Sequence, residues 1–136
     1  MPETDTTPVS ASIASTGKGI RYIGQHAYAM SGLINADENL TTLLDFTTGT
    51  GYIEAWVQIY ASTTQADDYE INILMNDVKI ISSEYEKSYS GQFVNGIPRR
   101  VIIPPLTQVK ITAQNTQGST HADWSAVVTG RVYGAT

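Results

Sequence analysis

The residues of this chain most able to take part in catalysis are its carboxylates and its few histidines. His121 stands two residues before Asp123, and such a pair could act as the base and orienting acid of a hydrolytic triad. The Gly-x-Ser-x-Gly turn that presents a serine nucleophile in many hydrolases is absent from the sequence. His26 lies within a strand-like run, where we expect it to be partly buried and hydrogen-bonded. We therefore predict no catalytic residue.

Two acidic clusters carry oxygen ligands of the kind that Ca²⁺ prefers. They are Asp67-Asp68 with Glu70, and Asp37-Glu38. Neither has the EF-hand spacing or a Gly-Asp repeat, so we interpret both as solvated loops that keep strand edges soluble. The chain has two histidines and no cysteine, too few nitrogen and sulfur ligands for a typical transition-metal site. We expect neither a metal nor a cofactor.

Aromatic rings are the remaining candidates for a binding site. In the run Tyr52–Tyr60, small and branched apolar residues alternate with polar and aromatic ones, which places the two sets on opposite faces of a strand. If Ile53 and Ile59 point inward, Trp56 and Tyr60 point outward. Such a pair can stack on a sugar or anchor a protein interface. The alternative is that a long loop or the N-terminal segment covers this second face.

Strand-forming runs, parted by turn-forming residues, fill the chain from Gly19 to Tyr133. Gly24 and Gly32 predict bends or bulges in the first run, Asn76-Asp77 predicts a two-residue hairpin turn, and residues 83–96 read as strand plus loop. The eight runs are Ile20–Ile34, Leu40–Phe46, Tyr52–Tyr60, Tyr69–Met75, Val78–Ser82, Ile97–Ile103, Thr107–Gln114 and Asp123–Tyr133.

These runs predict an all-β protein in which residues 19–136 form one antiparallel β-sandwich. Eight strands in one domain make the eight-stranded jelly roll the leading topology. The length of 136 residues and the 41% hydrophobic content suffice for one real core. Residues that alternate onto inward faces should form this core, and they are Ile53, Val57, Ile59, Ile71, Ile73, Val109, Ile111, Trp124 and Val128.

Residues 1–18 differ from the rest in being rich in Thr, Ser, Ala and Pro. Their only sizeable apolar side chains are Val9 and Ile13, too few to offset the entropy of ordering the segment alone. The segment is either a disordered tail or an extended arm that becomes ordered along a neighbouring subunit. In the second case Val9 and Ile13 are candidate partner contacts, together with Trp56 and Tyr60.

Charge and targeting signals narrow the class of partner. The formal net charge is −5, and the eight basic residues include one adjacent pair, Arg99-Arg100. This composition disfavours binding to nucleic acid or to an anionic membrane. No signal peptide and no membrane-spanning run is visible, so we expect synthesis in a cytoplasm. Charged residues make up 15% of the chain, below the roughly 25% of typical soluble domains. Such a surface suits contacts with other proteins.

Four segments resemble small jelly-roll virion proteins of tailed phages, as found in marine viral sequences. They are Tyr28–Gly32, Thr42–Gly49, Ile97–Asn115 and Thr129–Gly134. The resemblance implies a capsid decoration or cement protein, located in the virion. Its partners would be the major capsid protein or other virion proteins, and it would form a symmetric homo-oligomer such as a trimer. No functional residue carries over from the family.

A second class of function remains open beside the virion role. An outward Trp56 would also suit a carbohydrate-binding or receptor-binding β-sandwich at the tip of a fiber or spike, with a glycan as ligand. Copurification with capsids would favour the first function, and glycan-dependent Trp56 fluorescence the second. An enzyme is the third and most distant reading.

Overall fold

The computed structural model describes residues 19–61, 67–86 and 98–134, and within these ranges it contains strands and no helix. It therefore has no described helix of the length and apolarity needed to cross a membrane. The strands are β2 (Arg21–Ile23), β3 (His26–Met30), β4 (Ile34–Ala36), β5 (Thr41–Thr47), β6 (Tyr52–Ala61), β7 (Tyr69–Met75), β8 (Val78–Tyr85), β9 (Arg99–Ile103), β10 (Gln108–Asn115) and β11 (Ala122–Tyr133).

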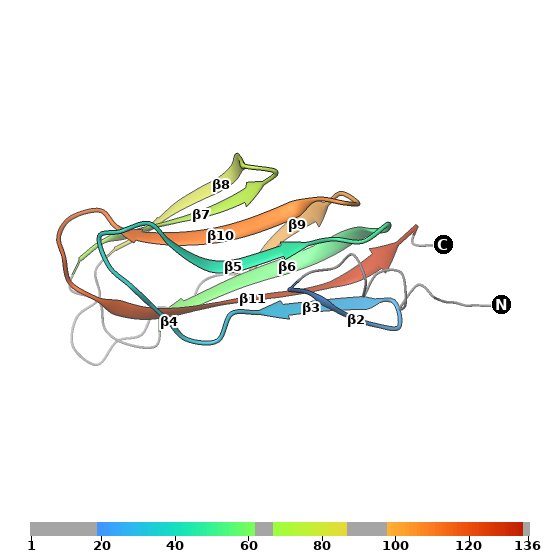
Figure 1. Ribbon diagram of the computed structural model, residues 1–136, viewed down its shortest axis with the longest axis horizontal. Coiled ribbons are helices and arrows are strands. Elements are labelled where there is room, and N and C mark those ends of the chain that lie inside the picture. The colour runs from blue at the N-terminus through green and yellow to red at the C-terminus, as the bar shows by residue number, and fades with distance from the viewer. Residues whose placement is uncertain (1–18, 62–66, 87–97, 135–136) are drawn as a thin grey trace.

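Two antiparallel sheets stack face to face as a sandwich (Figure 1). The four-stranded sheet has the order β5-β10-β7-β8. The six-stranded sheet has the order β2-β3-β11-β6-β9, and β4 also pairs with β11. The structure thus confirms the predicted all-β sandwich.

The strand order is that of a jelly roll. Strands pair as the two arms of one long folded hairpin: β3 with β11, β5 with β10, β6 with β9, and β7 with β8. The β10–β7 and β11–β6 pairings then join these pairs into two sheets. A double sheet of this kind leaves few open edges. It is built from many short strands, in agreement with the short, evenly spaced runs of the sequence.

The first predicted run is broken into three strands at its two glycines. Gly24 and Gly32 have φ angles of +57° and +72°, in the left-handed region that residues with a Cβ adopt at a cost. Because β3 and β4 both pair with β11, they form one interrupted strand. Asn76 and Asp77 have φ angles of +50° and +65°, as the predicted two-residue hairpin turn requires.

The core lies between the sheets and contains all nine residues predicted for it. Trp124 is its largest fully buried side chain, and its ring packs against the rings of Tyr69 and Tyr85 at centroid distances of 5.2 and 5.4 Å. Gly130 allows β11 to lie tightly against β6, because a Cβ there would come within 2.6 Å of the Glu54 carbonyl oxygen. The inward-facing residues of the strands therefore determine how the two sheets pack against each other.

Two predictions fall partly or wholly outside the described residues. The N-terminal arm with Val9 and Ile13 is outside them, and so is most of residues 83–96. Within the latter stretch, β8 continues to Tyr85, three residues beyond the end predicted from the sequence.

Candidate interaction surface

The outward side of the six-stranded sheet gathers aromatic, apolar and arginine side chains. Along each strand of this sheet, buried residues alternate with residues that face away from the core. We call this side the outer face. Its central residues are Arg21, Ile23, His26, Tyr28, Met30, Tyr52, Glu54, Trp56, Gln58, Tyr60, Arg100, Ile102, Val127, Thr129, Arg131 and Tyr133.

Strand register places these side chains in rows across the sheet. Thr129 pairs with Tyr28 on one side and with Trp56 on the other, so the two rings flank it. Trp56 pairs in turn with Arg100. Neighbouring strands lie about 4.8 Å apart, which sets the backbones of Tyr28 and Trp56 roughly 10 Å apart. The row therefore carries two aromatic residues and an arginine on one side of the sheet.

Large apolar groups on this face are open to solvent. The exposed fraction is 72% for Met30, 51% for Ile102 and 50% for Trp56. Ile23, Tyr28 and Tyr52 are also exposed on this face. Trp56 points outward, as its alternation with buried residues predicted, whereas Tyr60 is half-buried. Whether Trp56 and Tyr60 contact a partner stays a prediction.

Three arginines surround the aromatic rows. Arg100 forms an ion pair with Glu54 on the neighbouring strand. Arg131 donates a 3.0 Å hydrogen bond to Gln25 and lies 5.5 Å from the centroid of the Tyr133 ring, a cation–π distance. Arg21 is exposed on β2. Strand register pairs Arg21 with Tyr28 and Arg100 with Trp56, so a partner on this face can meet arginine and aromatic side chains together.

His26 differs from its prediction, because it is exposed. Alternation on β3 sends Ala27 and Ala29 into the core and therefore sends His26, Tyr28 and Met30 outward. Because the inward residues are small alanines, the buried face of this strand was hard to identify from the sequence.

A hollow of about 650 Å³ opens beside the start of β2. Outer-face side chains of β3 and β11 take part in its lining, among them Met30 and Val127, and Arg21 and Tyr28 lie at the same site. Just before β2, Gly19 lies against β5, the edge strand of the four-stranded sheet: its φ is +79°, and a Cβ would meet the Asp45 carbonyl oxygen of β5 at 2.5 Å.

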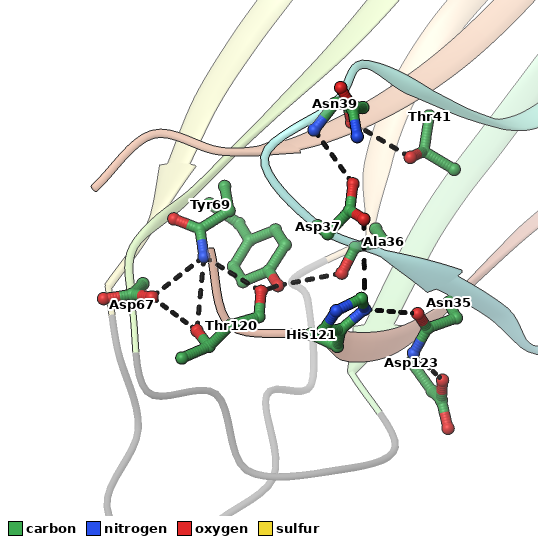
Figure 2. A network of polar contacts seen from close by, with 11 residues as sticks. Asn35, Ala36, Asp37, Asn39, Thr41, Asp67, Tyr69, Thr120, His121 and Asp123 are labelled. Atoms are coloured by element: carbon green, nitrogen blue, oxygen red, sulfur yellow. Dashed lines mark hydrogen bonds and ion pairs between the residues drawn. The ribbon is translucent and has the colours of Figure 1, made fainter. Parts of the chain in front are cut away.

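A second polar site lies at one end of the sandwich, where the acidic residues and His121 meet (Figure 2). The Tyr69 hydroxyl lies 3.0 Å from the Ala36 carbonyl oxygen and 2.9 Å from that of Thr120. The Asp67 carboxylate accepts hydrogen bonds from Thr120 and, at 2.9 Å, from the Asn115 amide. These bonds tie β7, β10 and the chain before β11 together, which is a structural role.

His121 is held by an amide rather than poised against a nucleophile. Its Nδ1 lies 2.8 Å from Asn35 Oδ1 and 4.0 Å from Asp37 Oδ2 (Figure 2). The Asn35 amide in turn donates to Asp123 at 2.9 Å. Asn35 therefore stands between the two members of the supposed pair. In a triad the imidazole would contact the carboxylate directly.

The acidic clusters are engaged with neighbouring polar groups. Asp68 accepts a 2.9 Å hydrogen bond from the Gln117 amide. Among the described residues, no group of three His, Asp or Glu side chains has the closeness that a metal ion would need.

Burial raises the pKa of Tyr69 above its ordinary value; a hydrogen bond with Asn115 opposes this rise, and the charges of Asp67, Asp37 and Glu38 add to it.

Reading the sequence strand by strand identified Trp56 and missed its neighbours. Tyr28, Met30 and Ile102 join Trp56 through pairings between segments far apart in the chain. The available signal was the alternation His-Ala-Tyr-Ala-Met in β3, which places every larger side chain on one face.

Comparison with known proteins yields no family. No family model and no curated protein matches the chain. Among solved structures, chains of infectious bursal disease virus align over 80% of this chain for the Gx strain and 82% for virus-derived T=1 particles. Both have a TM-score of 0.49, with identities of 12% and 11%. The alignment spans 33% of those viral chains.

Two non-viral structures also align. Eiger TNF from S. frugiperda has 13% identity and a TM-score of 0.47, over 76% of this chain and 90% of that one. The exo-beta-1,3-galactanase from Phanerochaete chrysosporium, solved with galactose, has 13% identity and a TM-score of 0.39, over 79% and 30%. Such low values establish neither a common family nor a common function.

Proposed function

We propose that this chain is a non-enzymatic structural protein of a virion, which decorates or cements a capsid through protein–protein contacts. The single observation that supports a contact of this kind is the composition of the outer face. It presents Trp56, Tyr28 and Met30 to solvent with arginines around them. Aromatic residues, Met and Arg are enriched in protein interfaces, and Trp, Tyr and Arg dominate their binding energy.

Exposed apolar side chains that gather on one face call for an occupant. Soluble monomers rarely present contiguous apolar patches beyond a few hundred square ångströms, and larger ones usually mark interaction sites. Here the exposed apolar side chains come from β2, β3, β6 and β9 of the six-stranded sheet, and the outward residues Val127 and Thr129 of β11, between β3 and β6, are half-buried. These side chains are spread over the strands of one sheet, an arrangement that suits a protein surface better than the enclosed pocket of a small-molecule enzyme.

The virion assignment draws on the sequence resemblance to small jelly-roll virion proteins of tailed phages. The proposed partners are the major capsid protein or other virion proteins, and the proposed assembly is a symmetric homo-oligomer. The jelly-roll strand order agrees with this origin, although many unrelated functions share such folds.

Particle inventory and binding measurements test the proposal together. Mass spectrometry of intact particles of the virus that encodes the chain should detect it in stoichiometric amounts. Purified protein should then sediment with capsids that lack it. The double variant Met30→Ala/Trp56→Ala should lower this affinity by about tenfold or more, because truncated interface anchors each cost roughly 1–2 kcal/mol or more.

A matched control comes from the other sheet. Val78 and Ile80 on β8 are also exposed, so Val78→Ala/Ile80→Ala removes comparable apolar groups away from the outer face. This control should bind capsids like the unaltered protein. Absence of the chain from particles would overturn the virion role, and equal loss in both double variants would overturn the assignment of the face.

We also propose that residues 1–18 act as an assembly arm, with Val9 and Ile13 seated on a neighbouring subunit. Ordering such a segment costs about 1–2 kcal/mol per residue, so its contacts must recur along its length, for example by strand addition to a sheet edge. Deleting the segment should leave the circular dichroism spectrum of a β-protein and weaken attachment to capsids. Unchanged attachment would reduce the arm to a tail.

A carbohydrate-binding or receptor-binding role is the second candidate. The observation that favours it is the pair of exposed rings, Tyr28 and Trp56, which flank Thr129 on one side of the sheet. Trp124 is fully buried, so a ligand-dependent fluorescence change would come from Trp56. A glycan-array hit whose signal disappears in Trp56→Phe would favour this role over the capsid contact.

A further inference from the structure

The outer face is basic, although the chain is acidic. Around its aromatic rows lie Arg21, Arg100 and Arg131; among the described outward residues of β2, β3, β6, β9 and β11 the acidic side chains are Glu54, in the same rows, and Asp123, near the start of β11. The face therefore carries a formal positive charge, while the whole chain carries −5. Three of the eight basic residues of the sequence gather here.

Register places the arginines at separate points around the apolar centre. Arg21 and Arg100 end the row that contains Tyr28 and Trp56, and Arg131 lies in the adjacent row beside Glu54. Glu54 is the ion-pair partner of Arg100. Arg21 and Arg131 are exposed. Arginine presents a planar fork that binds carboxylates through two hydrogen bonds, so both are suited to an acidic partner.

The hollow beside β2 adds an apolar element to this pattern. It combines Arg21 with the apolar side chains of Met30 and Val127. A volume of about 650 Å³ accommodates one or two large apolar side chains of a partner. A carboxylate next to such a side chain would reach the Arg21 guanidinium from the same segment.

We propose that the outer face binds an acidic surface of another protein, with carboxylates on Arg21 and Arg131 and an apolar side chain in the hollow beside Met30. The inference rests on the proposed function for the location of the contact and adds the chemistry of the partner. Two copies joined through this face would bring together two surfaces of like net charge, and like charges in an interface are unfavourable. A distinct acidic protein surface is therefore the occupant.

Charge reversal on the face is the direct test. Arg21→Glu/Arg131→Glu should weaken binding to capsids by more than about tenfold, because charge pairs at an interface are strongly coupled. Raising the salt concentration from about 0.05 M to about 0.5 M should weaken binding of the unaltered protein, because screening shortens the reach of surface charges. Lys79→Glu/Lys110→Glu makes the same charge change on the other sheet and should bind normally.

The outcomes separate this inference from the proposed function. Capsid binding that survives charge reversal but is lost in Met30→Ala/Trp56→Ala would keep the capsid role and overturn the acidic partner. Equal loss in both charge-reversed variants would attribute the effect to net charge and overturn it too. Urea midpoints and circular dichroism of each variant establish that the sandwich is intact.

A probe that needs no capsid tests the chemistry alone. Two short fluorescein-labelled peptides, identical except for Glu or Lys around shared leucines, are titrated with the full chain and followed by fluorescence anisotropy. We expect about tenfold or greater preference for the Glu peptide, and loss of that preference in Arg21→Glu/Arg131→Glu. No preference would contradict the inference. Tighter binding of an acidic polysaccharide than of the Glu peptide would replace the protein partner with a glycan.

Discussion

The two outer sides of the sandwich share an inward pattern and differ in what they present to solvent. The four-stranded sheet carries cross-strand polar pairs such as Lys110 beside Asp45, and the Gln108 amide donates a 3.1 Å hydrogen bond to Asp45. The six-stranded sheet carries Trp56 and Tyr28 in corresponding central positions. The centre of one side thus carries groups that water solvates well, with exposed Val78 and Ile80 at its β8 edge, and the other side carries aromatic groups that a partner protein would cover.

This difference separates the residues that specify the fold from those available for function. Inward positions on both sheets are apolar because they form the core, and a one-residue slip in register would turn them to solvent. Outward positions have no such requirement, so their content reflects what the surface does. Exposed aromatic and apolar side chains gathered from several strands of one sheet therefore argue for selection by a partner rather than for a demand of folding.

The largest effects should come from truncation beneath either face. Ile53→Ala and Ile111→Ala each remove a fully buried side chain, one from each sheet. Each should lower the free energy of unfolding by about 2–5 kcal/mol, because a cavity remains in a packed core. Urea denaturation followed by circular dichroism measures the loss.

Exposed neighbours of these residues provide the control. Trp56→Ala and Lys110→Ala remove side chains from the outward positions and should each change the free energy of unfolding by less than about 1 kcal/mol. If Trp56→Ala destabilised the protein as much as Ile53→Ala, the ring would belong to the fold, and the contrast between the two sides would lose its basis.

The sequence predicted the fold well because the inward pattern is local. Alternation in Tyr52–Ala61 identifies the buried face of β6 without reference to any other strand. The Asn76-Asp77 turn is equally local, since both residues adopt positive φ readily. The count and spacing of the runs leave few topologies, which made the jelly roll the leading one.

The candidate surface was harder to predict because its rows join distant segments. Tyr28 and Trp56 meet only through Thr129 on the last strand, and no local pattern records that pairing. His26 was misplaced for a related reason, since its face depends on the burial of two alanines that resemble surface residues as much as core residues. Outward orientation was therefore predictable for Trp56, whereas the composition of the surface was not.

An intermediate effect should follow from Tyr69→Phe at the end of the sandwich. The change removes the hydroxyl that lies between the Ala36 and Thr120 carbonyl oxygens and leaves a buried acceptor without its donor. We expect a loss of about 1–3 kcal/mol in the free energy of unfolding. Thr41→Ala, at an exposed hydrogen bond to Asn39, is the control and should change it by less than about 1 kcal/mol.

High pH should destabilise the fold through its buried phenols. Burial raises the pKa values of Tyr22, Tyr69 and Tyr85. Because these pKa values are higher in the folded chain, their stabilisation is fully present below the unfolded pKa of about 10 and is lost as the pH rises through the folded values. Urea midpoints should fall above about pH 10, and less steeply in Tyr69→Phe. An equal decline in both proteins would exclude Tyr69 as a contributor.

The smallest change in stability should come from Glu54→Gln, which nonetheless sharpens the contrast between the faces most directly. The ion pair of Glu54 with Arg100 is at the surface, with side chains 35% and 56% exposed, so its loss should cost no more than about 1 kcal/mol. Removing the carboxylate also makes the outer face more positive and frees the Arg100 guanidinium. Binding of the Glu peptide should therefore strengthen, whereas Asp45→Asn on the four-stranded sheet should leave it unchanged. Weaker binding in Glu54→Gln would mean that the Arg100–Glu54 pair, rather than positive charge, is what the partner contacts.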